Sequence, residues 1–204
     1  MANIGRMRKF AVVLAVLVCL APAPLGAATK GIKVKDNFFK PANVGVRVGD
    51  SVHWTRAADS FGSHNIHGER NLFLSGPVTT GSIDFKVRFS AGNFYYRCDL
   101  HGGANMEGFV RVPPSVTGAP SGLPFTVRWA TGKTKTGGRY AVQYRVGSSK
   151  TWRTWKPDTI TVSGVFGKSK KPVAVVNGKK YSFRARSKNK KGPSRWSPPR
   201  TFRA

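Results

Sequence analysis

The chain has 204 residues and a formal net charge of +27, and this charge is unevenly spread. Residues 29–112 carry 11 Lys and Arg and 7 Asp and Glu, whereas residues 113–204 carry 21 Lys and Arg and one acid, Asp158. Such an asymmetry indicates two domains with different roles. Because the chain's two cysteines are Cys19 and Cys98, an immunoglobulin-type disulfide in the second half is excluded.

Residues 1–28 have the features of a secretory signal peptide. A basic start precedes an apolar run over residues 11–20, and small residues then lead to a predicted cleavage after Ala27 or Ala28. The run is shorter than the ~20 residues of a membrane span, so no transmembrane segment is expected after cleavage. Cys19 is not expected to carry a lipid, because the valine before it stands where a small residue is required. We therefore expect an exported protein, located in the periplasm, at the cell surface or outside the cell.

Residues 29–112 are predicted to form a small β-sandwich. Apolar and polar residues alternate in short segments, and turn signals such as Gly49-Asp50 separate them. No stretch shows a helical period. The predicted strands are 32–36, 44–48, 51–55, 83–89, 92–98 and 108–112.

The loop from Cys98 to Met106 carries the clearest chemistry, read together with His64 further upstream. These residues and His101 offer one thiolate, two imidazoles and one thioether. A type 1 copper centre takes two His and one Cys in a trigonal plane with a weak axial Met. Loss of Cys19 with the signal peptide leaves Cys98 as the only thiol, and metal binding accounts for an unpaired thiol in an exported protein.

Residues 32–112 resemble a cupredoxin of the plastocyanin and pseudoazurin type. The matching pieces are Phe38-Phe39-Lys40-Pro41, Val48-Gly49-Asp50-Ser51-Val52-His53-Trp54, Ser63-His64-Asn65-Ile66 and Cys98-x2-His101-x4-Met106-x-Gly108. The resemblance implies a Greek-key β-sandwich that binds one type 1 copper ion through His64, Cys98, His101 and Met106. It also implies that Asn65 braces the ligand loop from outside the ligand set.

The two remaining histidines are not expected to bind metal. His53 lies on a predicted strand and is interpreted as a surface or core residue, and His67, three residues beyond His64, as part of a charged surface. A trinuclear copper cluster needs several His-x-His pairs, whereas this chain has four histidines and no such pair. Arg and Asp flank Cys98 where a coupled copper enzyme would place histidines. We therefore predict that the chain is not an enzyme.

A segment rich in Pro and Gly, residues 113–120, is predicted to link the two domains. It is too short for free tethering, so the domains are expected to keep a limited range of orientations. Residues 121–204 again alternate in short apolar segments, and strands are predicted over 125–129, 140–146, 152–155 and 181–187.

This second half resembles a fibronectin type III module. Trp129 lies where the second strand of that family carries its core Trp, and the segments Tyr181-x-Phe183-x-Ala185-Arg186 and Asn189-x2-Gly192-x3-Trp196-Ser197-Pro198 resemble its tyrosine-corner and closing strands. The resemblance places Trp129, Tyr144, Phe183 and Trp196 in the core. The predicted fold class is thus all-β, a cupredoxin Greek-key β-sandwich followed by a fibronectin type III β-sandwich.

The basic surface of the second half is concentrated in predicted turns. The lysines that gather there are Lys168, Lys170, Lys171, Lys179, Lys180, Lys188, Lys190 and Lys191. Such a surface predicts attraction to anionic cell-wall polymer, lipid headgroups or polyphosphate. No nucleic-acid recognition motif is present, so specific binding of nucleic acid is not expected. A proteome of high pI, or selection for solubility, would also account for part of the charge.

Three functions are consistent with these features. The leading hypothesis is an exported blue-copper electron carrier that serves a redox partner protein and is held near an anionic surface by its second domain. The alternative is a copper-binding or sequestering protein with no role in electron transfer. The third is an adhesive protein whose copper domain has lost its function, and the intact ligand set disfavours it. The visible spectrum of the copper-loaded protein distinguishes the first two.

Overall fold

The computed structural model describes residues 26–102, 106–118 and 121–204, and their regular secondary structure is almost entirely β-strand. The predicted all-β fold class is confirmed. Most of the predicted signal peptide, part of the ligand loop and the end of the predicted linker lie outside the described residues. The described chain includes two short 3-10 turns, η1 (Glu69–Asn71) and η3 (Lys168–Lys170). None of its helices has the length and apolarity to cross a bilayer.

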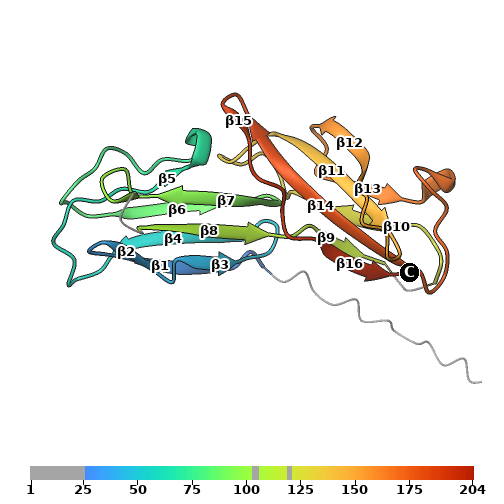
Figure 1. Ribbon diagram of the computed structural model, residues 1–204, viewed down its shortest axis with the longest axis horizontal. Coiled ribbons are helices and arrows are strands. Elements are labelled where there is room, and N and C mark those ends of the chain that lie inside the picture. Colours follow the sequence, from blue (N-terminus) through green and yellow to red (C-terminus); the bar gives the residue numbers. More distant parts are fainter. Residues whose placement is uncertain (1–25, 103–105, 119–120) are drawn as a thin grey trace, which may run out of the picture.

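Two four-stranded sheets form the first half of the molecule, drawn from blue to green in Figure 1. One has the order β2-β1-β4-β6 and the other β3-β8-β7-β5, with parallel pairing of β1 with β4 and of β3 with β8. The strands are β1 (Thr29–Lys35), β2 (Phe38–Lys40), β3 (Asn43–Gly45), β4 (Ser51–Arg56), β5 (His67–Gly68), β6 (Asp84–Arg88), β7 (Gly92–Arg97) and β8 (Glu107–Val112).

The core of this half lies between its two sheets and is rich in aromatic rings. Trp54 of β4 packs edge-on against Tyr96 of β7, with 5.3 Å between ring centroids, and both side chains are fully buried. Phe94, Tyr96 and Cys98 are all buried, whereas the alternate residues of β7 are not. Burial of such a side chain stabilises the fold by about 1.5–3 kcal/mol. The core therefore holds the end of β7, from which Cys98 projects, in a defined place.

The second half contains a three-stranded sheet, β13-β10-β9, and a larger sheet of order β12-β11-β14-β15 in which β16 also pairs with β14. The strand β9 lies within residues 113–120, the predicted linker, and its backbone pairs antiparallel with β10. The strands are β9 (Ser115–Thr117), β10 (Phe125–Arg128), β11 (Arg139–Val146), β12 (Arg153–Thr159), β13 (Ser163–Phe166), β14 (Lys180–Asn189), β15 (Gly192–Pro193) and β16 (Arg200–Arg203).

Three of the four predicted core aromatics of this half are buried, namely Trp129, Tyr144 and Phe183. The prediction for Trp196 is wrong. Its ring is half-buried and stacks on the guanidinium groups of Arg184 and Arg186. Residues of β14 alternate between two faces, so these arginines point away from the core that Phe183 enters. Trp196 therefore covers the outer face of the sheet.

The two halves meet at the beginning of β7. The amide of Ala91 donates to the carbonyl of Trp129 at 2.7 Å, and the amide of Asn93 donates to the carbonyl of Arg195 at 3.1 Å. The Arg195 side chain pairs with Glu69 at 2.9 Å and lies over the ring of Tyr95. Cys98 directly follows the last residue of β7, so this backbone contact and Cys98 lie at opposite ends of the same strand. Figure 1 shows β7 running from the second half into the first.

Candidate metal centre

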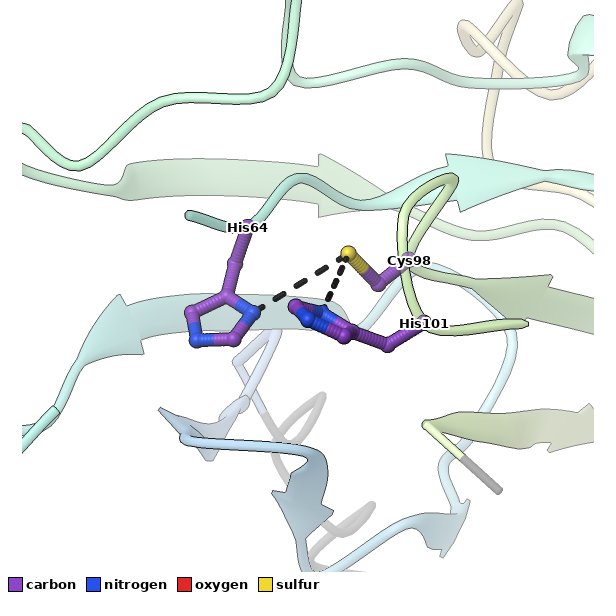
Figure 2. A group of neighbouring side chains, drawn as sticks. All are labelled: His64, Cys98 and His101. Carbon is purple, nitrogen blue, oxygen red and sulfur yellow. Dashed lines mark hydrogen bonds between the residues drawn. The ribbon is translucent and has the colours of Figure 1, made fainter. Parts of the chain in front are cut away.

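Three predicted ligands, His64, Cys98 and His101, lie together at one end of the first half. His64 follows β4, Cys98 directly follows β7, and His101 lies in the loop that leads to β8. The Cys98 Sγ lies 3.6 Å from Nδ1 of His101 and 4.0 Å from Nδ1 of His64, as Figure 2 shows. One donor atom from each residue lies within 4.8 Å of the other two, which is close enough for one metal ion to bind all three.

The three side chains differ in their access to solvent. His64 and Cys98 are fully buried, whereas His101 is only half-buried. The Cys98 thiol is free and makes no disulfide. The thiolate form of cysteine binds metal. A buried thiol between two imidazole nitrogens therefore places a soft sulfur donor beside two nitrogen donors, a set that suits copper.

An aspartate orients the buried histidine. His64 Nε2 lies 3.0 Å from Oδ1 of Asp36, the residue that follows β1. Asp36 also accepts hydrogen bonds from the amides of Phe61 and Gly62 and from the hydroxyl of Ser60. The His64 contact, followed by these amides and the hydroxyl, lowers the pKa of Asp36 well below its usual range. The carboxylate is therefore ionised and acts only as an acceptor.

Sequence reasoning missed Asp36. It ends a predicted strand and has no diagnostic spacing from His64, from which it is separated by 28 positions. A carboxylate or carbonyl that accepts the second ring N–H of a ligating histidine is a general feature of metal sites. The general rule predicts that an acceptor for the second ring N–H of His64 exists, but the sequence does not indicate which residue supplies it.

Asn65 joins the segment of His64 to the segment of Cys98. Its side-chain oxygen accepts the amide hydrogen of Asp99 at 2.9 Å, and its side-chain nitrogen donates to the Asp99 carboxylate at 2.8 Å and to the Gly76 carbonyl at 3.1 Å. These bonds tie the residue after Cys98 to the residue after His64. Asn65 therefore restrains the distance between these two side chains.

The other two histidines make contacts outside the cluster. Nδ1 of His67 bonds to the Asp99 carboxylate at 2.7 Å, and its Nε2 contacts Asn71. Nε2 of His53 contacts the carboxylate of Asp84 on the neighbouring strand β6. Both rings are partly exposed, in agreement with the surface role that we expected for His67.

Met106 lies at the end of the loop that begins at Cys98, directly before β8. Its side chain is fully buried in the same core cluster as Cys98. Its carbonyl accepts the Cys98 amide hydrogen at 3.0 Å, and its amide donates to the His101 carbonyl at 3.4 Å. The backbone thus holds Met106 beside both loop ligands, although residues 103–105 between them lie outside the described part of the chain.

The donor set identifies the kind of metal that fits. One thiolate and two imidazoles are the in-plane ligands of a type 1 copper site, whose fourth ligand is a weak thioether. Structural zinc, by contrast, takes four strong ligands in a tetrahedron. In the residues that the structure describes, His64, Cys98 and His101 are the one group of this kind, and Asp99 and Asp36 are engaged with other partners. The chemistry of the cluster therefore fits one copper ion.

No family model matches the chain, and no curated protein matches it. Among solved structures it is similar to a reduced Cu(I) form of an amicyanin mutant, with 24% identity over 45% of this chain and 86% of that chain and a TM-score of 0.35. A second reduced amicyanin mutant has 25% identity over 43% and 82%, with a TM-score of 0.34. The copper-containing nitrite reductase of Thermus scotoductus SA-01 has 20% identity over 41% and 22%, with a TM-score of 0.35. TM-scores this low carry no argument about function. The metal assignment therefore rests on the donor atoms of His64, Cys98 and His101.

Proposed function

We propose that the first half is a cupredoxin-like domain that binds one type 1 copper ion and carries single electrons. His64, Cys98 and His101 would hold the ion, and the observation that supports this best is the buried Cys98 thiol lying between two imidazole nitrogens. Met106 would supply the weak thioether ligand, supported by its burial and by its backbone bonds to Cys98 and His101. Bound copper supplies the one-electron Cu(I)/Cu(II) couple.

The protein's contribution is to keep the donor atoms still. Asn65 ties the Cys98 segment to the His64 segment, and Asp36 holds the His64 ring in one orientation. The aromatic core beneath β7 excludes water from the thiolate side. A ligand set that keeps its positions in both oxidation states needs little reorganisation when an electron enters or leaves, which favours fast transfer.

Electrons leave through His101, the ligand that reaches solvent. Two exposed apolar side chains lie beside the ligand segments, namely Leu100, 60% exposed, and Phe61, 80% exposed. Leu100 precedes His101, and the Phe61 amide bonds to Asp36. Exposed apolar side chains grouped around a site are typical of interaction surfaces. Because the second half contacts the other end of β7, it leaves this end free for a redox partner protein.

The second half, in this proposal, is a fibronectin type III-like module. The hydroxyl of Tyr181 accepts the Val176 amide at 2.9 Å and contacts the Ala174 carbonyl at 3.4 Å. A tyrosine near the start of a strand that bonds back to the chain a few residues upstream is the tyrosine-corner arrangement of such sandwiches. The three-stranded sheet packed against the larger sheet also supports the proposal.

The proposal includes export and attachment. The basic, apolar and small-residue segments of residues 1–28 support secretion. The excess of Lys and Arg in residues 113–204 supports attachment to an anionic polymer of the cell envelope. Four histidines without a His-x-His pair support a carrier rather than a multicopper enzyme.

One experiment tests the copper proposal against the sequestering alternative. The purified chain is titrated with Cu(II), its visible spectrum is recorded, and voltammetry follows. We expect the intense visible absorption of a Cu(II)–thiolate bond and a reversible one-electron wave, both lost in Cys98→Ser and kept in His53→Gln, the matched control outside the cluster. A colourless protein that takes up only Cu(I) would instead establish sequestration.

A further inference from the structure

Arginine and tryptophan side chains alternate along the outer face of the larger sheet in the second half. The Arg145 guanidinium lies 4.8 Å from the ring centre of Trp152, and that of Arg184 lies 4.4 Å from the same ring. Arg184 also lies 4.8 Å from the ring of Trp196, and Arg186 lies 4.5 Å from it. We name Arg145, Trp152, Arg184, Trp196 and Arg186, in this spatial order, the Arg–Trp ladder.

The ladder concentrates positive charge without a carboxylate to balance it. None of its three arginines forms an ion pair within the described residues, and the one acid of the second half, Asp158, pairs with Arg139 and Lys188. Arg184 donates two hydrogen bonds to the side-chain oxygen of Gln143, at 2.9 and 2.6 Å, so it meets a neutral group. Burial, followed by the charges of Arg145 and Arg186, lowers the pKa of Arg184.

The hydrogen-bonding edges of Arg145 and Arg186 remain available, whereas Arg184 keeps only the N–H groups that it does not donate to Gln143. The guanidinium carbons lie 4.4–4.8 Å from the ring centres, the range in which arginine contacts an aromatic face and its N–H groups can still bond to other partners. In Arg145 and Arg186 no hydrogen bond from these N–H groups to the described residues is found, and both side chains are half-buried. The rings fix the planes in advance, so a ligand that bonds to their edges loses less conformational entropy on binding.

We propose that the Arg–Trp ladder is the binding site for a linear phosphate polymer. The inference rests on the proposed attachment of the second half to an anionic partner, and it moves the site from the lysine-rich turns to this sheet face. Planar guanidinium groups bind phosphate oxygens in a bidentate manner that lysine does not reproduce. Three guanidinium groups in a row match a chain that carries a charge on each repeat.

Two other anionic partners fit the ladder less well. Single-stranded nucleic acid binds by stacking its bases on open aromatic faces, but guanidinium groups cover the faces of Trp152 and Trp196. A lipid surface is held by protruding apolar side chains beside cations, whereas both rings are half-buried and contact arginines. Nucleic acid and lipid are therefore the competing outcomes of the test.

The test uses the full chain without copper and long-chain inorganic polyphosphate as the probe. Arg184→Gln removes the central guanidinium, and Lys168→Gln removes the same charge from the turn η3, outside the ladder. We expect Arg184→Gln to weaken binding roughly tenfold or more and Lys168→Gln by less than about threefold, since a hydrogen-bonded phosphate contact is stronger than diffuse attraction. Arg184→Lys keeps the charge but loses the planar fork, so it is expected to weaken binding nearly as much as Arg184→Gln.

A loss of fold is separated from a loss of contact by a second variant. Arg145→Gln changes the end of the ladder, where the side chain touches one ring, and its melting temperature is measured beside its affinity. Equal weakening by Arg184→Gln and Lys168→Gln would overturn the ladder while leaving electrostatic attachment in place. Absence of polyphosphate binding, or preference for anionic vesicles or single-stranded DNA, would overturn the phosphate-polymer site. Addition of Cu(II) to a separate portion of each sample, followed by its visible spectrum, reports on the copper proposal independently.

Discussion

Nε2 of His64 donates a hydrogen bond to Oδ1 of Asp36 at 3.0 Å, and this contact decides which nitrogen of His64 faces Cys98. An ionised carboxylate can only accept, so the proton must be on Nε2. Nδ1 then carries a free lone pair, and it is the atom that lies 4.0 Å from the Cys98 Sγ. The orientation of a buried ligand is thus set by a residue at the end of β1, on a different segment of the chain.

Removal of the Asp36 charge is expected to weaken copper binding. Asp36→Ala leaves the His64 ring without its acceptor, and loss of such partners typically costs about 10–100-fold in metal affinity. Competitive titration with a copper chelator measures the change. Asp59→Ala is the matched control, because Asp59 is an exposed acid paired with Lys35. Equal affinities for the wild type and Asp36→Ala would show that Asp36 does not position His64.

Substitution of the proposed axial ligand is expected to change the reduction potential while copper stays bound. Met106→Gln replaces a thioether by an amide oxygen, a harder donor that favours Cu(II), so the potential should fall. Voltammetry of the copper-loaded variant measures the shift, and the visible absorption shows that the Cys98 bond remains. A potential equal to that of the wild type would mean that Met106 is not the axial ligand.

Gly108 is expected to be intolerant of any side chain. A Cβ at this position would lie 1.9 Å from the Ala42 carbonyl oxygen and 2.7 Å from the Tyr96 hydroxyl, which bonds to that carbonyl. Gly108→Ala must therefore shift β8 or break this bond, at a cost of about 1–3 kcal/mol. We expect the melting temperature to fall by roughly 2–10 °C. Gly45→Ala is the control, since a Cβ there meets nothing within 4 Å, and an equal change in both variants would contradict the steric explanation.

The buried hydroxyl of Ser187 is expected to contribute to the contact between the two halves. It donates to the Ala91 carbonyl at 3.1 Å and therefore accepts from the Ser90 hydroxyl at 2.6 Å. Ser187→Ala removes this donor from the Ala91 carbonyl and leaves the Ser90 hydroxyl only its longer contacts with Thr134 and Thr136, at 3.5 and 3.4 Å. Loss of the donor to a buried carbonyl costs about 1–3 kcal/mol. Thermal unfolding followed by tryptophan fluorescence should show a lower transition than in the wild type. Ser148→Ala, at an exposed position, should melt as the wild type does.

Asp158 is expected to stabilise the second half only above acidic pH. The hydrogen bond from Arg139, at 2.8 Å, lowers the pKa of Asp158 below its ordinary value. A carboxyl with a lowered folded-state pKa stabilises the fold above its ordinary value of about 3.9, and this contribution is lost as pH falls through the lowered value.

Asp158→Asn should therefore melt slightly below the wild type at pH 7, and the difference should disappear as the pH falls below the lowered pKa, where Asp158 is protonated in both states. Melting curves across this pH range measure the difference. High salt should shrink it at pH 7, because the pair is exposed. A difference that grows as the pH falls would contradict the assignment.

The amino-acid sequence determined the features that depend on neighbouring positions. Cys98, His101 and Met106 share one loop, so their proximity follows from the chain itself, and the alternation of Phe94, Tyr96 and Cys98 indicates which face of β7 is buried. The all-β class follows from the same period-two patterns.

Only the tertiary structure decided the features that join distant positions. Asp36 reaches His64 because β1 pairs in parallel with β4, and no local pattern encodes that register. Sequence alone places Trp196 in the core. In the structure its ring lies on the outer face of the sheet, where it contacts the guanidinium groups of Arg184 and Arg186. The contact of Ser187 with Ser90 likewise spans 97 positions. The register of strand pairing decides which distant residues lie next to one another. These partners can therefore be identified only from the tertiary structure.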